Sequence, residues 1–386
     1  MVSTRKVIVV FFMLGFVSLF ADIVYEGARS VSGAYLSTIG SPPIGPAIVG
    51  AGELVGYVMR LLSGLLAYAY QSSAIVWGFT IAGYAVTAFS IPMLALAPSW
   101  QAVAVIYAVE RAGKGLRAPT RDVITAEVSE GMGLGKGFGI HELLDQLGAF
   151  VGPLFVAFAV ATWGYRIAFA ALAIPGLVAL TLVLASYKLY PLLKSFSVKR
   201  PSLGFYGLSK GFWLYTASTC ILALGFMHWA IASYYLKQYR LTLDYEVGLI
   251  YAVAMLVDAL VAVPLGVAFD KIGYKVLLVT PLLSFAFVLL LLYTPRELQL
   301  LIAIPWGIVA CSEESIMRAA VARLVEPSSR PSAYGIYGML YGLSWTLGGF
   351  ILSYLVGNSV VLLAYCATTS IASAVLLLAL LKTTKV

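Results

Sequence analysis

Long apolar segments alternate with short polar breaks along the whole chain. A helix of roughly 17 to 25 apolar residues crosses the hydrocarbon core of a bilayer, and the sequence divides into twelve such segments. The fourth and tenth are the weakest of the twelve, because they carry several charged residues. The segments lie at 7–36, 44–69, 75–97, 99–120, 137–161, 165–187, 209–236, 243–268, 275–294, 298–323, 333–356 and 358–381. The pattern predicts an all-α polytopic membrane protein with twelve transmembrane helices.

Composition supports this prediction and excludes several classes of protein. Of the 386 residues, 61% are hydrophobic and 11% are charged, whereas about 25% are charged in an ordinary soluble domain. The net charge of +8 comes mostly from Lys and Arg beside the apolar segments, which is not the pattern of a nucleic-acid binder. The cysteines Cys220, Cys311 and Cys366 lie inside apolar segments without metal-ligand spacing. We therefore expect no cofactor, no resident metal and no nucleic-acid partner.

The longest polar connection, 189–208, divides the chain into an N-terminal half, 1–188, and a C-terminal half, 209–386. The connections on the side of the two termini hold most of the Lys and Arg residues. By the positive-inside rule both termini are cytoplasmic, and we expect the protein to lie in the cell membrane.

The two halves also show a weak internal repeat. Laying 314–325 on 117–128 matches Arg318 with Arg121, at corresponding places in the two halves. Parallel repeats of six helices place a binding site between the halves, near the middle of the bilayer.

Three local motifs resemble those of the major facilitator superfamily of secondary transporters. The loop 266–275, GVAFDKIGYK, is similar to the superfamily's cytoplasmic motif through Gly266, Asp270, Lys271 and Lys275. The equivalent loop of the first half, 64–73, keeps a glycine but has Tyr68 where the motif has aspartate.

The other two motifs lie in the fourth and fifth segments. The run 111–115, RAGKG, is similar to the family's R-x-x-Q-G pattern, with Lys114 in place of glutamine. The run 148–153, GAFVGP, resembles the core of a motif of proton-driven exporters through Gly148, Gly152 and Pro153. Its alternative interpretation is a packing motif common to many membrane proteins. The resemblance implies two pseudo-symmetric halves of six helices, alternating access and no enzymatic activity.

Six charged side chains fall within 110–122, in the fourth segment. Their depth separates them into two groups. Arg117 and Arg121 lie near the cytoplasmic end, and the fifth segment brings His141, Glu142 and Asp145 to the same level. We expect an inner layer of ion pairs there, which either gates the cavity or only holds two helices together.

Glu110, Arg111 and Lys114 lie near the middle of the membrane, where ionisable groups are costly. The resemblance implies that the first, fourth, seventh and tenth helices line a central cavity. It makes Asp22, Glu26 and Glu110 candidates for proton coupling. The candidates for substrate contact are Arg29, Arg111, Lys114, His228, Glu313, Glu314 and Trp345.

The hypothesis is a secondary active transporter, acting as a monomer, that exports a small organic solute in exchange for protons. One alternative is an anionic solute held by the cationic stripe of the fourth helix. A metal-ion exporter would use Asp22 with His228 and Cys220. A polytopic membrane enzyme would need a catalytic motif, and none is recognisable in the sequence.

Overall fold

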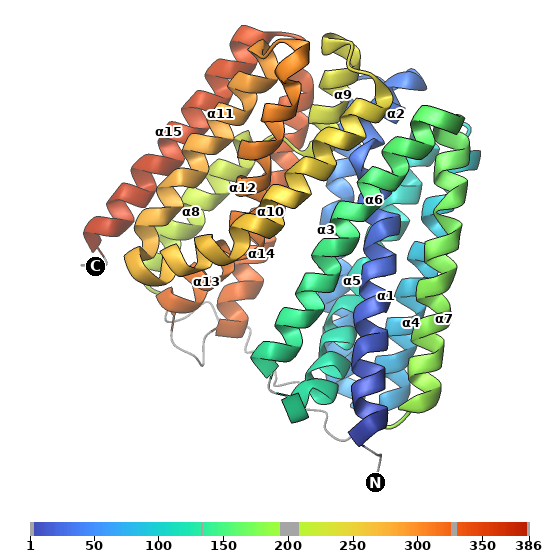
Figure 1. Ribbon diagram of the computed structural model, residues 1–386. Helices are drawn as coiled ribbons and strands as arrows, with labels where there is room; N and C mark the ends of the chain where they lie inside the picture. The colour runs from blue at the N-terminus through green and yellow to red at the C-terminus, as the bar shows by residue number, and fades with distance from the viewer. Residues whose placement is uncertain (1–3, 133, 194–207, 326–329, 384–386) are drawn as a thin grey trace.

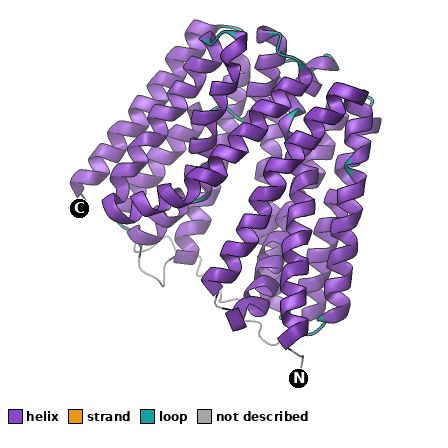
Figure 2. Cartoon of the chain, viewed as in Figure 1, coloured by secondary structure: helices purple, strands orange, loops and turns teal. Residues whose placement is uncertain are grey.

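The computed structural model describes residues 4–132, 134–193, 208–325 and 330–383. In this part of the chain all regular structure is helical, and the helices run roughly alongside one another (Figure 2). They form twelve transmembrane spans, several of which are built from two or three consecutive helical pieces. The prediction of an all-α protein with twelve spans is confirmed.

Six spans make up the N-terminal half. They are α1 (Thr4–Ser30) with α2 (Ser32–Thr38), α3 (Ile44–Tyr70), α4 (Ser73–Ser90) with η1 (Ile91–Leu96), α5 (Trp100–Ser129), the first part of α6 (Leu134–Ala171), and the rest of α6 with α7 (Ala173–Leu189). A short turn, η2 (Glu130–Met132), follows α5. Gly164, with φ 77°, divides α6 into its two parts, because this left-handed conformation interrupts the helix and suits a residue without a Cβ atom.

Six further spans make up the C-terminal half. They are α8 (Lys210–Gly225) with α9 (Trp229–Arg240), α10 (Asp244–Ile272), η3 (Gly273–Leu278) with α11 (Val279–Tyr293), η4 (Arg296–Ile302) with α12 (Ala303–Glu314) and α13 (Ile316–Leu324), α14 (Arg330–Leu355), and α15 (Ser359–Thr383). Most of the polar connection at 189–208 lies outside the described residues, as does the side chain of Arg318.

Apolarity alone identifies most of these spans. Eight helical segments of the described chain are long and apolar enough to cross a membrane, and two of them, Gly139–Leu189 and Asp244–Tyr293, each contain two spans. The fourth and tenth spans are absent from this set. They are the two that the charged residues weaken, and both border the central cavity described below.

The two halves meet mainly along three helix pairs. Residues of α6 pack against α10, those of α3 against α14, and those of α2 against α9. Figure 1 shows the N-terminal half in blue to green and the C-terminal half in yellow to red, with both termini at the same end. At the opposite end α2 and α9 lie side by side (Figure 1) and join the two halves there.

Candidate functional site

A cavity of about 460 Å³ lies between the two halves. Both halves contribute to its wall, and an unusual share of the lining is ionisable. The ionisable lining residues of the N-terminal half are Asp22, Glu26, Arg29, Arg60, Lys114, Arg117, Arg121, Glu142 and Asp145. Those of the C-terminal half are Asp258, Glu313 and Glu314, beside the aromatic side chains of Phe226, Trp306 and Trp345.

The first helix carries two carboxylates into this cavity. Asp22 forms no ion pair or hydrogen bond with another described side chain, and the charged side chains that act on it most strongly are those of Asp145 and Lys114. One turn further along α1, Glu26 accepts a 2.5 Å hydrogen bond from the phenol of Tyr251 in α10 and lies 3.5 Å from Arg29. The two carboxylates thus lie on one face of α1, but only Glu26 is tied to the opposite half.

Packing of α6 against α1 fixes the position of these carboxylates. A Cβ atom added at Gly148 would lie 2.3 Å from the carbonyl oxygen of Leu19 and 3.1 Å from the Cβ of Asp22. One added at Gly152 would lie 2.6 Å from the carbonyl oxygen of Ile23. Glycine at both positions therefore allows the two helices to approach closely.

Arg111 does not line the large cavity; instead, two carboxylates and an aromatic ring surround its guanidinium group. Its Nη2 lies 2.6 Å from Glu110 Oε2, and its Nη1 lies 3.1 Å from Glu53 Oε1. The guanidinium carbon lies 3.4 Å from the centroid of the Tyr25 ring. Arg111 is thereby compensated by its own half.

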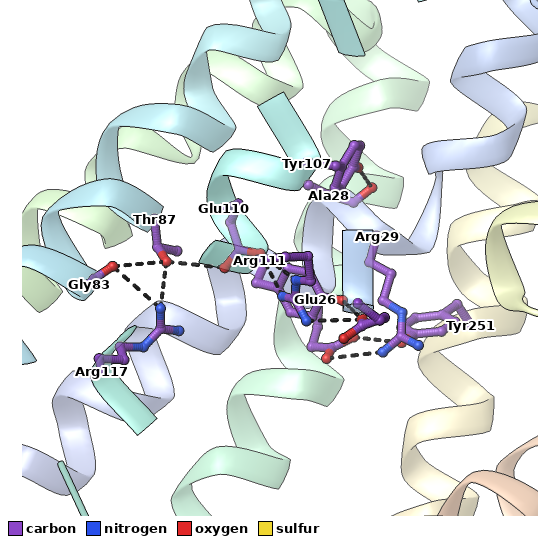
Figure 3. Close-up of polar contacts among 12 residues, drawn as sticks. Glu26, Ala28, Arg29, Gly83, Thr87, Tyr107, Glu110, Arg111, Arg117 and Tyr251 are labelled. Atoms are coloured by element: carbon purple, nitrogen blue, oxygen red, sulfur yellow. Dashed lines mark hydrogen bonds and ion pairs between the residues drawn. The ribbon is translucent and has the colours of Figure 1, made fainter. Parts of the chain in front are cut away.

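Glu110 does not line the central cavity, although the sequence made it a candidate for proton coupling there. Its side chain is completely buried and lies outside the cavity lining. Besides Arg111, its carboxylate accepts a 3.1 Å hydrogen bond from the hydroxyl of Thr87 in α4 (Figure 3). The carboxylate of Glu110 therefore faces α4 and not the central cavity.

Arg117 follows Glu110 toward α4 instead of joining the expected inner ion-pair layer. Its Nη1 donates to Thr87 Oγ1 at 2.7 Å and to the Gly83 carbonyl at 3.4 Å (Figure 3). Its guanidinium carbon also lies 4.7 Å from the centroid of the Tyr84 ring. No carboxylate of the described chain lies within 4.0 Å of it.

The other residues of the predicted inner ion-pair layer form fewer ion pairs than expected. Arg121 Nη1 lies 3.6 Å from Asp145 Oδ2, and its Nη2 lies 2.9 Å from Asp122 Oδ1. His141 contacts Ser18 at 3.0 Å, and its Nε2 lies 3.9 Å from Asp145. Glu142 is exposed and accepts a hydrogen bond only from Gln146 among the described side chains.

His228 lies in a second, smaller cavity of about 30 Å³. Its Nε2 is 2.9 Å from the Trp345 carbonyl oxygen, its ring stacks 4.1 Å from that of Trp345, and Gly50 and Gly349 lie against it. Arg29 and Trp345 line both cavities, so they form the partition between them. Asp22 borders only the larger cavity.

The other two acidic candidates lie on α12. Glu313 accepts a hydrogen bond from the hydroxyl of Tyr341 in α14, and Glu314 follows it at the end of the helix. Ser315, with φ −110° and ψ −81°, breaks the span just beyond them. Among the described residues no group of three or more His, Cys, Asp or Glu side chains is placed to hold a metal ion.

Contacts between the halves close the end of the cavity away from the termini. Trp229 Nε1 donates to the Ser30 carbonyl at 2.6 Å, and the Gly33 backbone N–H donates to Ser233 Oγ at 3.0 Å. A Cβ atom at Gly33 would lie 1.8 Å from the Ala230 carbonyl oxygen. This closeness of α2 and α9 is possible only with glycine at that position.

The loop motif of the C-terminal half lies at the end of the molecule that holds the termini. Asp270 Oδ1 lies 2.7 Å from Arg323 Nη2 in α13, while Lys271 and Lys275 are exposed. Gly266 does not pack closely against a neighbouring helix, because a Cβ atom there would meet nothing within 4 Å. Asp270 has its basic partner, Arg323, within its own half.

Comparison with known proteins identifies this architecture. The family profile of the Major Facilitator Superfamily matches residues 7–247 and, in a second overlapping match, 215–386. The chain belongs to the Major Facilitator Superfamily. It is therefore a secondary transporter integral to the membrane and not an enzyme, as the sequence motifs predicted.

Individual relatives resemble the chain over most of its length. An uncharacterized protein of Mycobacterium tuberculosis (strain ATCC 25618 / H37Rv) is 36% identical over 90% of this chain and 87% of its own. An uncharacterized MFS-type transporter of Methanocaldococcus jannaschii is 25% identical over 89% and 87%. Neither name specifies a substrate.

Solved structures of transporters share the fold at low identity. The nucleoside transporter NupG superposes with a TM-score of 0.73 at 14% identity, covering 98% of this chain and 99% of that one. A POT family transporter in complex with 5-aminolevulinic acid gives a TM-score of 0.74 at 14% identity, over 96% and 95%. These similarities concern the fold alone.

Several residues of the site escape prediction from the sequence because they are neutral. Tyr25, Thr87 and Tyr251 contact the charged side chains directly, yet tyrosine and threonine are common in membrane helices. The one available signal is the position of Tyr25, directly before Glu26 on the helix that carries Asp22.

Proposed function

We propose that this transporter moves a small organic solute across the cell membrane by alternating access and couples that movement to protons. The observation that carries the proposal is Asp22, a carboxylate on the cavity wall that has no partner among the described side chains and has Lys114 nearby. A carboxylate in such a cavity can bind a proton when the cation moves away and release it when the cation returns.

Glu26 is the second proton-coupling residue of the proposal. Its hydrogen bond from Tyr251 crosses between the halves, so its protonation state is linked to the closure of the cavity. Glu110 has a different role in the proposal. Its contacts with Arg111 and Thr87, away from the cavity, suit a structural ion pair.

The test begins with finding a solute. A ligand that binds the folded protein raises its unfolding temperature, so purified protein is first screened against metabolites, drugs and metal ions at several pH values. Relatives of this fold that are named nucleoside and peptide transporters support starting with small organic molecules.

The solute found in the screen is then followed into proteoliposomes under an imposed pH gradient. We expect Asp22→Asn and Glu26→Gln to abolish gradient-driven accumulation while equilibrium exchange of labelled solute continues. The exposed Glu297→Gln in η4 is the matched control and behaves as the parent protein. Accumulation that ignores the pH gradient, or that survives both substitutions together, contradicts proton coupling.

We further propose that both termini are cytoplasmic and that transport is outward. Lys and Arg beside the membrane on the termini side support the orientation, and the packing of Gly148 and Gly152 against α1 supports the exporter pattern. Inside-out vesicles should accumulate the solute when their lumen is made acidic. Accumulation only in right-side-out vesicles would show import instead.

A second candidate function is the transport of an anion. Lys114 supports it, because this ammonium group lines the cavity without a carboxylate of the described chain within 4.0 Å. Saturable binding of carboxylates or phosphate esters that is lost in Lys114→Ala would establish it. In both functions we propose that the protein acts as a monomer, because the two halves of one chain supply both walls of the cavity.

A further inference from the structure

The two walls of the central cavity carry different charges. The wall of the N-terminal half presents five basic side chains among four acidic ones, whereas the described residues of the opposite wall contribute three carboxylates and no Lys or Arg. A cavity with opposite preferences on its two sides distinguishes solutes by where their charges lie, not only by their net charge.

On the basic wall, Lys114 is more available to a solute than Arg29, Arg117 or Arg121. Arg121 lies beside Asp122 and Asp145, and Arg29 lies beside Glu26. Arg117 donates to Thr87 and the Gly83 carbonyl. The Nζ of Lys114 lies 4.5 Å from the centroid of the Tyr25 ring and forms no ion pair within the described chain.

On the acidic wall, Asp258 of α10 is a carboxylate without an ion pair to a Lys or Arg of the described chain. Its side chain is 3% exposed, and it borders the cavity. The charged side chains that act on it most strongly are themselves carboxylates, Glu314 first and then Glu142 and Glu26. A carboxylate in such surroundings is stabilised by a positive charge that enters the cavity.

Aromatic side chains cover the lining of the C-terminal half around these carboxylates. The ring centroids of Phe226 and Trp306 are 6.1 Å apart, and those of Phe226 and Trp345 are 5.8 Å apart. They offer an apolar surface to the body of a solute and a π face to a nearby cation.

We propose that the transported solute is a zwitterion. Its anionic group binds Lys114 on the wall of the N-terminal half, and its ammonium group binds Asp258 on the wall of the C-terminal half. The proposal rests on the proposed function, for which it names the class of solute. It also gives a reason for the cavity to close around the solute, because one molecule then contacts both halves.

The test uses a series of probes in which the two charges are separated by increasing distances. The zwitterions are 4-aminobutanoate, 6-aminohexanoate and 8-aminooctanoate, and the singly charged matches are hexanoate and hexylamine. Binding to the purified full chain is measured by calorimetry near neutral pH. We expect one zwitterion to bind at least roughly tenfold more tightly than both matches, since each charge-assisted contact contributes about that factor.

Variants assign each charge to its wall. Lys114→Ala should reduce the affinity for the zwitterion to that for hexylamine, and Asp258→Asn should reduce it to that for hexanoate. Lys188→Ala and Glu297→Gln remove the same charges from exposed positions outside the cavity and should change nothing. Partial rescue by Lys114→Arg and Asp258→Glu, with unfolding temperatures close to the parent's, separates lost binding from lost folding.

Each other outcome overturns the proposal. Hexanoate binding as tightly as any zwitterion indicates an anionic solute, and hexylamine binding as tightly indicates a cationic one. No binding by any probe also contradicts it. The proposed function fails separately: a zwitterion that binds but whose uptake ignores a pH gradient overturns proton coupling and leaves the solute class standing.

Discussion

The phenol of Tyr251 in α10 donates a 2.5 Å hydrogen bond to the carboxylate of Glu26 in α1, across the boundary between the two halves. The same carboxylate lies 3.5 Å from Arg29, whose guanidinium carbon is 6.0 Å from the centroid of the Tyr251 ring. A residue proposed to bind protons thus also holds the two halves together, at the end of the cavity nearest to the closed side.

Tyr251→Phe should weaken this closure without creating a void. Hydrogen bonds to charged groups contribute about 1.5–3 kcal/mol, so the equilibrium between closed and open outer ends should shift by roughly tenfold or more. The reporter is a cysteine at Ser32, which is buried at that end, in a background without the three native cysteines. Maleimide should label Ser32→Cys faster in the Tyr251→Phe variant. Equal labelling rates would show that the bond does not hold the halves together.

Gly33→Ala should open the same end more strongly. The new methyl group would lie 1.8 Å from the Ala230 carbonyl oxygen, a distance that the backbone of α9 can relieve only by moving away. We expect labelling of the Ser32 reporter to increase and solute transport to fall. Gly78→Ala is the control, because a Cβ atom there meets nothing within 4 Å. Parent-like labelling and transport in Gly33→Ala would contradict the proposed closure.

Glu110→Gln should lower the stability of the protein without removing proton coupling. The substitution breaks a completely buried ion pair with Arg111, and such a change costs about 3–5 kcal/mol of stability. Asp22→Asn, which removes no ion pair of the described chain, should cost less than about 1 kcal/mol. Unfolding titrations in mixed micelles measure both. If the Glu110→Gln protein is stable but has lost proton coupling, Glu110 is a proton-coupling residue and not a structural one.

Gly50→Ala and His228→Ala should compensate for each other. A Cβ atom at Gly50 would lie 2.3 Å from His228 Nδ1, so overpacking should cost about 1–3 kcal/mol. Removing the imidazole leaves a void beside Trp345, with a loss of about 2 kcal/mol. In the double variant the methyl group enters that void, and the combined loss of unfolding free energy should be smaller than the sum. Strict additivity would mean that the two side chains do not share the space.

The fold could be predicted from the sequence because the apolar pattern is long and regular. Inside a membrane such segments form helices, because a helix satisfies its own backbone hydrogen bonds. The sequence also predicted how deep in the membrane the charged residues lie. It was less informative about which neighbouring helix or cavity each charged side chain faces. Glu110, Lys114 and Arg117 fall on one stripe of α5, yet Lys114 lines the cavity while Glu110 contacts α4.

The reason for this difference lies in the neighbours of α5. A helical wheel places Cα atoms, whereas a long side chain follows the partner it finds. Thr87 and Gly83 of α4 offer a hydroxyl and a carbonyl, and Glu110 and Arg117 turn toward them. Neither partner is charged, so no charge pattern could reveal them before the helices were packed.

The partition between the two cavities has a consequence of its own. Arg29 and Trp345 face the larger cavity on one side and the smaller one on the other, so a single layer of side chains separates the two compartments. A rotamer change of either side chain, on a timescale far shorter than the rocking of six-helix halves, would join the two cavities. The space open to a solute therefore depends on how rigidly these two side chains are held, and shortening either one would merge the two compartments into a single larger site.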